Sequence, residues 1–137
     1  MKIDFWFEFG STYSYPAAMR VEKLAAHHGV GVNWRPFLLG AIFREQGLMD
    51  TPFNLYPAKG RYMWRDLERI CGALGIPFQR PSVFPRNGLL AARVACCFDD
   101  ERWLPYFVRA GSRANVVVAP ALSDAVGVGG CCASAGA

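Results

Sequence analysis

The sequence has 137 residues, which is the size of a single domain. It is 53% hydrophobic, 14% aromatic and 19% charged, so it has enough apolar material for a core and is not of the disordered class. The net charge of +4 comes without a run of Lys and Arg, which argues against nucleic acid as a partner and would suit a small anionic ligand.

Residues 2–37 predict a strand, a helix and a second strand. Residues 2–9 alternate between apolar and polar positions, which is the period of a strand, and Gly10 ends it. From Pro16 the apolar positions follow helical spacing up to a stop at Gly29; they are Val21, Leu24, Ala25 and His28. "VGVNW" at 30–34 alternates again. Such a unit favours two parallel strands with a crossover helix, and its functional edge lies where the first strand enters the helix.

Residues 38–110 predict mainly helices. The segment 62–75, "YMWRDLERICGALG", carries one apolar stripe and stops at a glycine followed by a proline; the stripe is Met63, Leu67, Ile70 and Leu74. Two further helices are predicted in "LLAARVACCF" at 89–98 and "ERWLPYFVRA" at 101–110, after a proline-rich loop at 81–87.

Residues 111–137 change in composition. They are rich in Gly, Ala and Val, contain no aromatic residue and carry only two charged side chains. Small side chains bury little area and offset little ordering entropy, so we expect a weakly structured, low-complexity tail. Within it, the β-branched run "ANVVVA" at 114–119 is the part best suited to pair with an open sheet edge.

The cysteines and the N-terminus argue against a disulfide framework, a zinc site and a secretory signal. Five cysteines occur without a C-x-x-C motif, which favours neither a disulfide framework nor a zinc site. No apolar run is long enough to span a membrane, and acidic residues interrupt "MKIDFWFEF" where a secretory signal would be apolar. We therefore expect a cytoplasmic protein with reduced thiols, no metal site and no membrane partner.

Hydroxyl residues gather in "GSTYSY" at 10–15, at the predicted strand-to-helix turn. Free backbone N–H groups at the start of a helix favour anions, and a serine there can also donate its O–H group. We predict that Ser11 faces a ligand anion. The alternative is that Ser11 or Ser14 only caps the helix, which is the commoner use of such residues.

Two separated stretches resemble one protein family. "DFWFEFGSTYSYPA" and "PFNLYPAKGRYMWRDLERICGALGIPFQRPSVFPRN" are similar to 2-hydroxychromene-2-carboxylate isomerases and kappa-class glutathione transferases, and the likeness runs from about Lys2 to about Ala110. The resemblance implies an α/β, thioredoxin-like fold of the DsbA-like type. The N-terminal βαβ half would be 1–37 and an inserted all-helical domain would be 38–110. The family's C-terminal ββα half would be missing or degenerate at 111–137.

The resemblance also implies site residues for a glutathione cofactor. Ser11 matches the catalytic serine, which hydrogen-bonds the glutathione sulfur and favours its thiolate. Thr12 stands where the family has a proline, and Tyr13 matches an aromatic residue of the glutathione pocket. Lys59 matches a lysine that contacts the tripeptide through charge pairing; the alternative is a solvated loop lysine.

The amide donor of the family site has no clear match. Near position 50 the family has an asparagine, and here Asp50 takes its place, with Asn54 close enough to be considered. A carboxylate at that position would weaken the binding of an anionic ligand.

The implied function is a glutathione-dependent isomerase of aromatic catabolism with a small aromatic carboxylate substrate. In the family reaction the thiolate adds, the ring opens, a bond rotates and elimination returns glutathione. The alternatives are a kappa-like glutathione transferase or peroxidase, and a non-catalytic truncated fragment, which the change at 111–137 would suit. A dithiol oxidoreductase is excluded because serines stand at both positions of a C-x-x-C motif. An open sheet edge would also allow self-association, including a homodimer.

Overall fold

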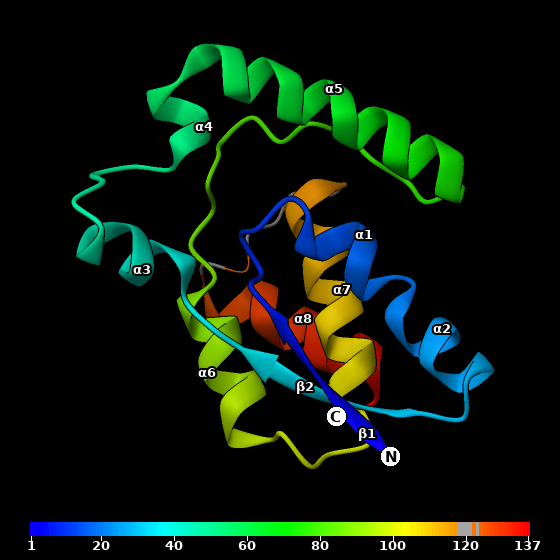
Figure 1. Ribbon diagram of the computed structural model, residues 1–137. Coiled ribbons are helices and arrows are strands. Elements are labelled where there is room, and N and C mark those ends of the chain that lie inside the picture. The colour runs from blue at the N-terminus through cyan, green and yellow to red at the C-terminus, as the bar shows by residue number, and fades with distance from the viewer. Residues whose placement is uncertain (118–121, 123) are drawn as a thin grey trace.

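The computed structural model describes residues 1–117, 122 and 124–137. Strand β1 (Lys2–Phe7) pairs in parallel with β2 (Gly31–Pro36), with Lys2 opposite Gly31 and Phe7 opposite Pro36. The two strands lie side by side near the middle of the molecule, and helices flank them (Figure 1). The predicted strand–helix–strand unit with parallel strands is therefore confirmed.

The connection between the strands holds two helices instead of the one expected. They are α1 (Ser14–Ala18) and α2 (Val21–His27). Arg20 leaves helical geometry between them, with φ −120°. The predicted stripe is consequently wrong for part of α2: Ala25 is buried, whereas Leu24 and His28 are exposed.

Residues 38–110 are mainly helical, as predicted. Their helices are α3 (Leu39–Glu45), α4 (Pro52–Leu55), α5 (Pro57–Leu74), α6 (Leu89–Cys97) and α7, which runs on beyond this region (Leu104–Val116). Helix α5 starts five residues earlier than expected and ends at Gly75, whose φ of 64° suits glycine. Its buried face includes Met63 and Leu67, but Leu74 at its end is exposed. Helices α4 and α5 form a layer across the top of Figure 1.

The main core joins the end of β1 to helices that lie much later in the chain. Phe7 packs edge-on against Trp34 of β2, with ring centres 5.7 Å apart. Phe9 packs in the same way against Phe107 of α7, also at 5.7 Å. Aromatic side chains of β1 and of the turn that follows it therefore supply the bulk against which α6 and α7 pack.

The expectation of a weakly structured tail at 111–137 is wrong for the described residues. Helix α7 continues to Val116, and α8 (Ala125–Ala135) buries Val128 and Cys131. Small side chains are used for close approach: a Cβ on Gly111 would lie 2.8 Å from the Phe9 ring. The aromatic surface missing from this segment is supplied by its neighbours, so its described residues pack despite their composition.

Asp124 lies just before α8, and the β-branched run at 114–119 begins within α7. The Asp124 side chain accepts a hydrogen bond from the Gly127 N–H at 2.8 Å and caps α8. The first three residues of the run at 114–119 belong to helix α7 rather than to a strand, and positions 118 and 119 lie outside the described residues.

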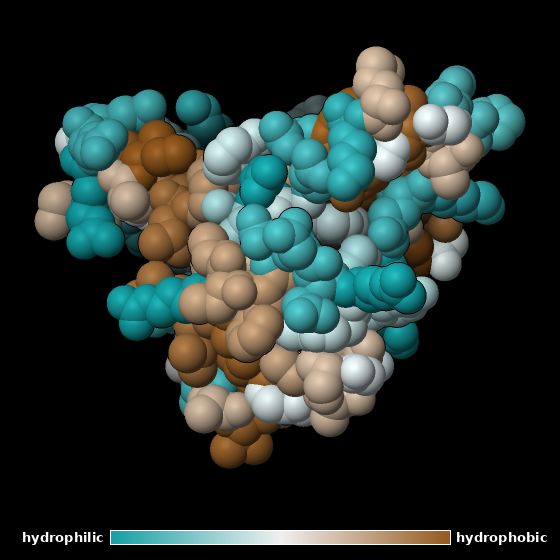
Figure 2. Space-filling model, turned by 90° about the horizontal axis from the view of Figure 1, so that it is seen from below, coloured by the Kyte–Doolittle hydropathy of each residue, from teal (hydrophilic) through white to brown (hydrophobic). Residues whose placement is uncertain are grey.

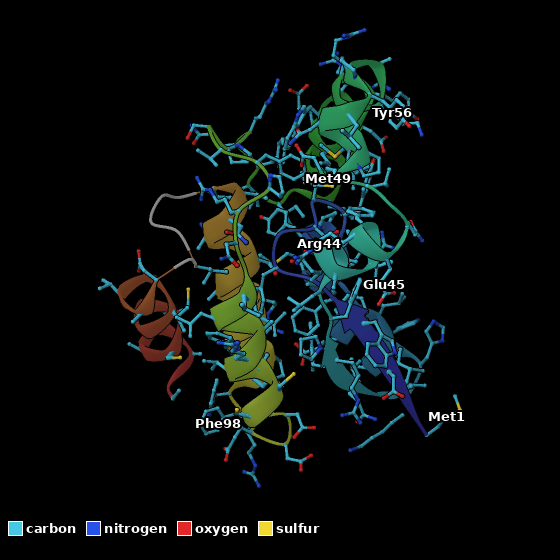
Figure 3. The ribbon with its side chains drawn as sticks, turned by 90° about the vertical axis from the view of Figure 1, so that its left-hand side faces the viewer. Met1, Arg44, Glu45, Met49, Tyr56 and Phe98 are labelled. Carbon is cyan, nitrogen blue, oxygen red and sulfur yellow. The ribbon has the colours of Figure 1, made fainter. Side chains whose placement is uncertain are left out.

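The surface and the termini complete the fold. The face seen from below carries a band of hydrophobic side chains beside hydrophilic ones (Figure 2). In the side view, Met1 and Phe98 lie at one end of the molecule, while Met49 and Tyr56 lie towards the other (Figure 3). None of the helices described is both long and apolar enough for a transmembrane span.

The predicted division into an N-terminal βαβ half at 1–37, a helical domain at 38–110 and a tail at 111–137 has domain boundaries that stay predictions.

Candidate functional site

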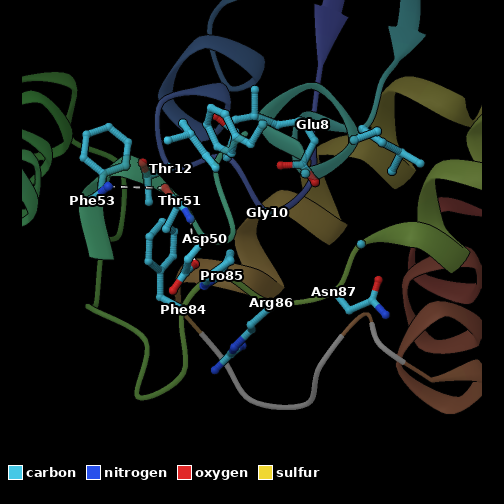
Figure 4. Close-up of a pocket in the computed structure, with 18 of the residues that line it drawn as sticks. Glu8, Gly10, Thr12, Asp50, Thr51, Phe53, Phe84, Pro85, Arg86 and Asn87 are labelled. Atoms are coloured by element: carbon cyan, nitrogen blue, oxygen red, sulfur yellow. Dashed lines mark hydrogen bonds between the residues drawn. The ribbon is translucent and has the colours of Figure 1, made fainter. Parts of the chain in front are cut away.

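A cavity of about 490 Å³ opens beside the turn that follows β1. Its wall comes from the turn at 8–13, from helix α3 and the residue before it, from α4 and the loop before it, and from residues 84–89. The close-up shows these segments around the cavity (Figure 4). Its size falls within the range of small-molecule sites. Ser11, Thr12, Tyr13 and Asp50, four of the five predicted site residues, line it.

Ser11 has a cap-like contact and also faces the cavity. Its Oγ accepts a hydrogen bond from the Ser14 N–H at 3.4 Å, and Ser14 Oγ accepts one from the Glu8 N–H at 3.3 Å. Within the described residues the Ser11 hydroxyl donates no hydrogen bond, so its proton is available to a ligand. Helix α1 has only five residues, so its dipole contributes little to anion binding at this turn. Binding there would depend more on the Ser11 O–H group as a hydrogen-bond donor.

Thr12 and Tyr13 tie the turn to helix α5. Thr12 is buried and its Oγ1 donates to Met63 Sδ at 3.1 Å. The Tyr13 hydroxyl donates to Asp66 Oδ2 at 2.9 Å. Desolvation, followed by the neighbouring Asp66 carboxylate, raises the pKa of Tyr13 to about 12. Both side chains are thus engaged with α5, and Tyr13 is neutral at physiological pH.

Asp50 lies on the cavity wall, but its carboxylate is already engaged. Its Oδ1 accepts from the Thr51 N–H at 2.6 Å, and its two oxygens accept from Asn54 Nδ2 at 3.2 and 3.0 Å. Asn54 also donates to the Phe84 carbonyl at 3.2 Å and is not among the cavity-lining residues. The two residues therefore hold the α4 region against the 84–88 segment.

Lys59 is not brought to the cavity. It is exposed in the first turn of α5, with its Nζ 4.9 Å from the centre of the Tyr56 ring. The cationic side chains that do line the cavity are Arg44 and Arg86. Local sequence offers no signal for them, because the cavity forms only when α3 and the 84–88 segment approach the turn.

Glu8 is a cavity residue that the sequence analysis did not single out. Its carboxylate lies close to two glycines: a Cβ on Gly10 would be 3.2 Å from both of its oxygens, and a Cβ on Gly88 would be 3.6 Å from Oε1. The close-up shows the Glu8 side chain beside Gly10 (Figure 4). Desolvation raises the pKa of Glu8, and hydrogen bonds from the backbone of Gly10 and Ser11 partly offset the rise. The only signal for Glu8 in the sequence is its position, since it is an acidic residue three positions before the predicted site residue Ser11.

Comparison with protein families and curated proteins shows consistent relationships. The DSBA-like thioredoxin domain model matches residues 2–127. Glutathione S-transferase kappa 1 of Caenorhabditis elegans is 37% identical over 84 residues, which are 61% of this chain and 36% of that protein. 2-Hydroxychromene-2-carboxylate isomerase of Pseudomonas putida is 32% identical over 87 residues, which are 64% of this chain and 41% of that protein.

A solved structure of a 2-hydroxychromene-2-carboxylate isomerase shares the fold. It superposes with a TM-score of 0.83 at 23% identity, covering 99% of this chain and 66% of that one. The predicted family and the thioredoxin-like fold of the DsbA-like type are therefore confirmed. The alignments with the curated relatives span about two fifths of their length or less.

Proposed function

The chain belongs to the DSBA-like thioredoxin domain family, and from this premise we propose that it is a glutathione-dependent isomerase of the 2-hydroxychromene-2-carboxylate isomerase type. The observation that carries the proposal is the Ser11 hydroxyl, which lines a cavity of ligand size and keeps its proton available within the described residues. Both curated relatives are enzymes by name, which supports enzymatic activity. Glutathione, when bound, would supply a nucleophilic thiolate.

The residues present fit such a ligand at the turn. Ser11 would donate a hydrogen bond to the sulfur, and a charge-assisted bond of this kind contributes roughly 1.5–3 kcal/mol. Thr12 and Tyr13 hold the turn in place through their contacts with α5. Arg44 and Arg86 bring two positive charges to the wall, which would attract carboxylates, while Arg86 Nη1 also donates a hydrogen bond to the Ala114 carbonyl at 3.2 Å.

The apolar part of the wall suits an aromatic substrate. It includes Leu38 just before α3, Phe43 in α3, Phe53 in α4 and Phe84 in the 84–88 segment. A flat aromatic ring can be sequestered from water by side chains of this kind, while its carboxylate remains near the arginines. This arrangement supports a small aromatic carboxylate as the substrate class.

A kappa-like glutathione transferase or peroxidase is the second candidate. The 37% identity to the Caenorhabditis elegans kappa transferase favours it. The glutathione subsite would be the same, and only the second substrate would differ. A non-catalytic fragment is the third candidate, because the aligned part covers 36% and 41% of the two curated relatives.

The experiment is glutathione binding to the purified chain by isothermal titration calorimetry, with S-methylglutathione as the control that lacks a free thiol. The same preparation would be assayed for isomerisation of 2-hydroxychromene-2-carboxylate and for conjugation of glutathione to an aryl halide. Binding with isomerisation supports the proposal. Binding with conjugation alone supports the transferase, binding without turnover supports the fragment, and no binding overturns the glutathione site.

A further inference from the structure

We propose that Glu8 is the acid–base residue of the cavity and that its carboxyl group moves the proton that ring opening requires. The inference rests on the proposed function and deepens it by assigning a second catalytic residue beside Ser11. The Glu8 carboxylate lies at the cavity wall. Gly10 and Gly88, which belong to separate segments, leave room for it there.

The backbone holds Glu8 firmly at this position. Its N–H donates to Ser14 Oγ at 3.3 Å, and its carbonyl accepts from the Ser11 N–H at 3.1 Å. A Cβ on Gly10 would also meet the Arg86 carbonyl at 2.9 Å, and a Cβ on Gly88 would meet Phe9 Cβ at 2.9 Å. A side chain at either glycine would push the turn and the 84–88 segment apart, so the glycines keep the carboxylate between them.

Glu8 is better suited to proton transfer than the other acid of the cavity. The Asp50 carboxylate already accepts three hydrogen bonds, one from the Thr51 N–H and two from Asn54 Nδ2, so its oxygens are occupied. Glu8 instead loses hydration, which raises its pKa towards neutrality, where general acid–base residues work best. The other charged or titratable side chains that line the cavity are Tyr13, Arg44 and Arg86.

The chemistry of the substrate class calls for such a group. A 2-hydroxychromene-2-carboxylate is a cyclic hemiketal, with a hydroxyl and a ring oxygen on one carbon. The Glu8 carboxylate takes the hydroxyl proton, the bond from that carbon to the ring oxygen breaks with its electron pair leaving on the oxygen, and a ketone forms. The Glu8 carboxylic acid then returns the proton to the phenolate oxygen. No proton or electron is gained or lost overall, and Glu8 ends in its starting state.

The decisive comparison is Glu8→Gln with wild type and with Glu101→Gln as the matched control, since Glu101 is exposed in the α6–α7 loop. Loss of a general acid–base group should lower kcat for isomerisation by about 100-fold or more. Glutathione affinity by calorimetry should stay at the wild-type value. The acid limb of the kcat–pH profile should lie above 4.5, the ordinary pKa of a glutamate, and should disappear in Glu8→Gln. Glu8→Asp should recover part of the rate.

A second readout does not depend on turnover. The carboxyl carbons of ¹³C-labelled glutamate are titrated by NMR, and the resonance missing in Glu8→Gln or, where that variant does not fold, in Glu8→Asp identifies Glu8. This resonance should titrate above 4.5 and move further up when glutathione is added. A Glu8 resonance that titrates at 4.5 or below and ignores glutathione overturns the assignment, even if Glu8→Gln fails to fold. An active wild type with an equally active Glu8→Gln overturns the role of Glu8 alone. A wild type that neither binds glutathione nor isomerises overturns the proposed function and the role of Glu8 together.

Discussion

The Tyr13 hydroxyl donates a hydrogen bond to the Asp66 carboxylate at 2.9 Å, which joins the turn after β1 to helix α5 across 53 residues of sequence. A second bond, from Thr12 to Met63, makes the same connection one residue earlier. The turn that carries Ser11 is therefore positioned from two sides, by the strand that precedes it and by the helix that lies above it.

The Tyr13 contact predicts an alkaline transition. Its folded-state pKa of about 12 exceeds the ordinary value of 10.0, first because of desolvation and then because of Asp66. The raised pKa favours the protonated phenol in the folded state, so its contribution to stability is complete below pH 10 and is lost as the pH rises towards 12. Tyrosinate absorbance of wild type minus that of Tyr13→Phe should show a titration near pH 12. A difference titration at pH 10 would contradict the contact.

Ser11 and Ser14 should differ in their effect on bound glutathione. Ser11→Ala removes the proposed donor to the sulfur and should raise the thiol pKa by about one to two units, since one unit corresponds to about 1.36 kcal/mol. Ser14→Ala removes the acceptor of the Glu8 N–H and should lower the melting temperature without moving that titration. Thiolate absorbance against pH measures both. If neither substitution moves the titration, the hydroxyl cluster only caps the turn.

Two valines of α8 form a matched pair that tests how this helix packs. Val128 is 5% exposed in the main core, whereas Val126 is 82% exposed on the same helix. Threonine has nearly the same shape, so Val128→Thr buries a hydroxyl and should cost about 1–3 kcal/mol of unfolding free energy. Val126→Thr should change it by less than about 0.5 kcal/mol, as surface substitutions do. Equal, small effects in urea unfolding would mean that α8 is not packed as described.

The unpaired edge of β1 predicts self-association. Among the described residues β1 pairs only with β2, and Ile3 and Trp6 on this strand are exposed. An open edge with apolar side chains can pair with a second copy, which supports a homodimer as a proposal. Size-exclusion chromatography should show concentration-dependent association that Trp6→Lys weakens and Val126→Lys leaves unchanged. A monomer at high concentration would argue against it.

Local patterns were enough to predict several elements of this protein. Alternation in residues 2–9 and 30–34 predicts two strands, helical spacing in 62–75 predicts α5, and the apolar run at 89–98 predicts α6, because each signal lies within one short stretch. The two family-like stretches predicted the fold that the comparisons confirm. The place of Ser11 at the strand-to-helix turn predicts a site residue; Ser11 lies on the cavity wall, and its role in binding stays a prediction.

Tertiary structure decided the features that depend on contacts between distant segments. The composition of 111–137 predicted poor packing, yet Gly111 lets α7 approach Phe9, whose ring lies about one hundred residues earlier in the chain. The cavity forms only where α3 and the 84–88 segment meet the turn, so Arg44 and Arg86 line it while Lys59 points elsewhere. Glu8 follows the same rule. Its alternation in the strand marks it as an ordinary polar residue, and only burial in the folded chain removes enough water from its carboxylate to raise its pKa.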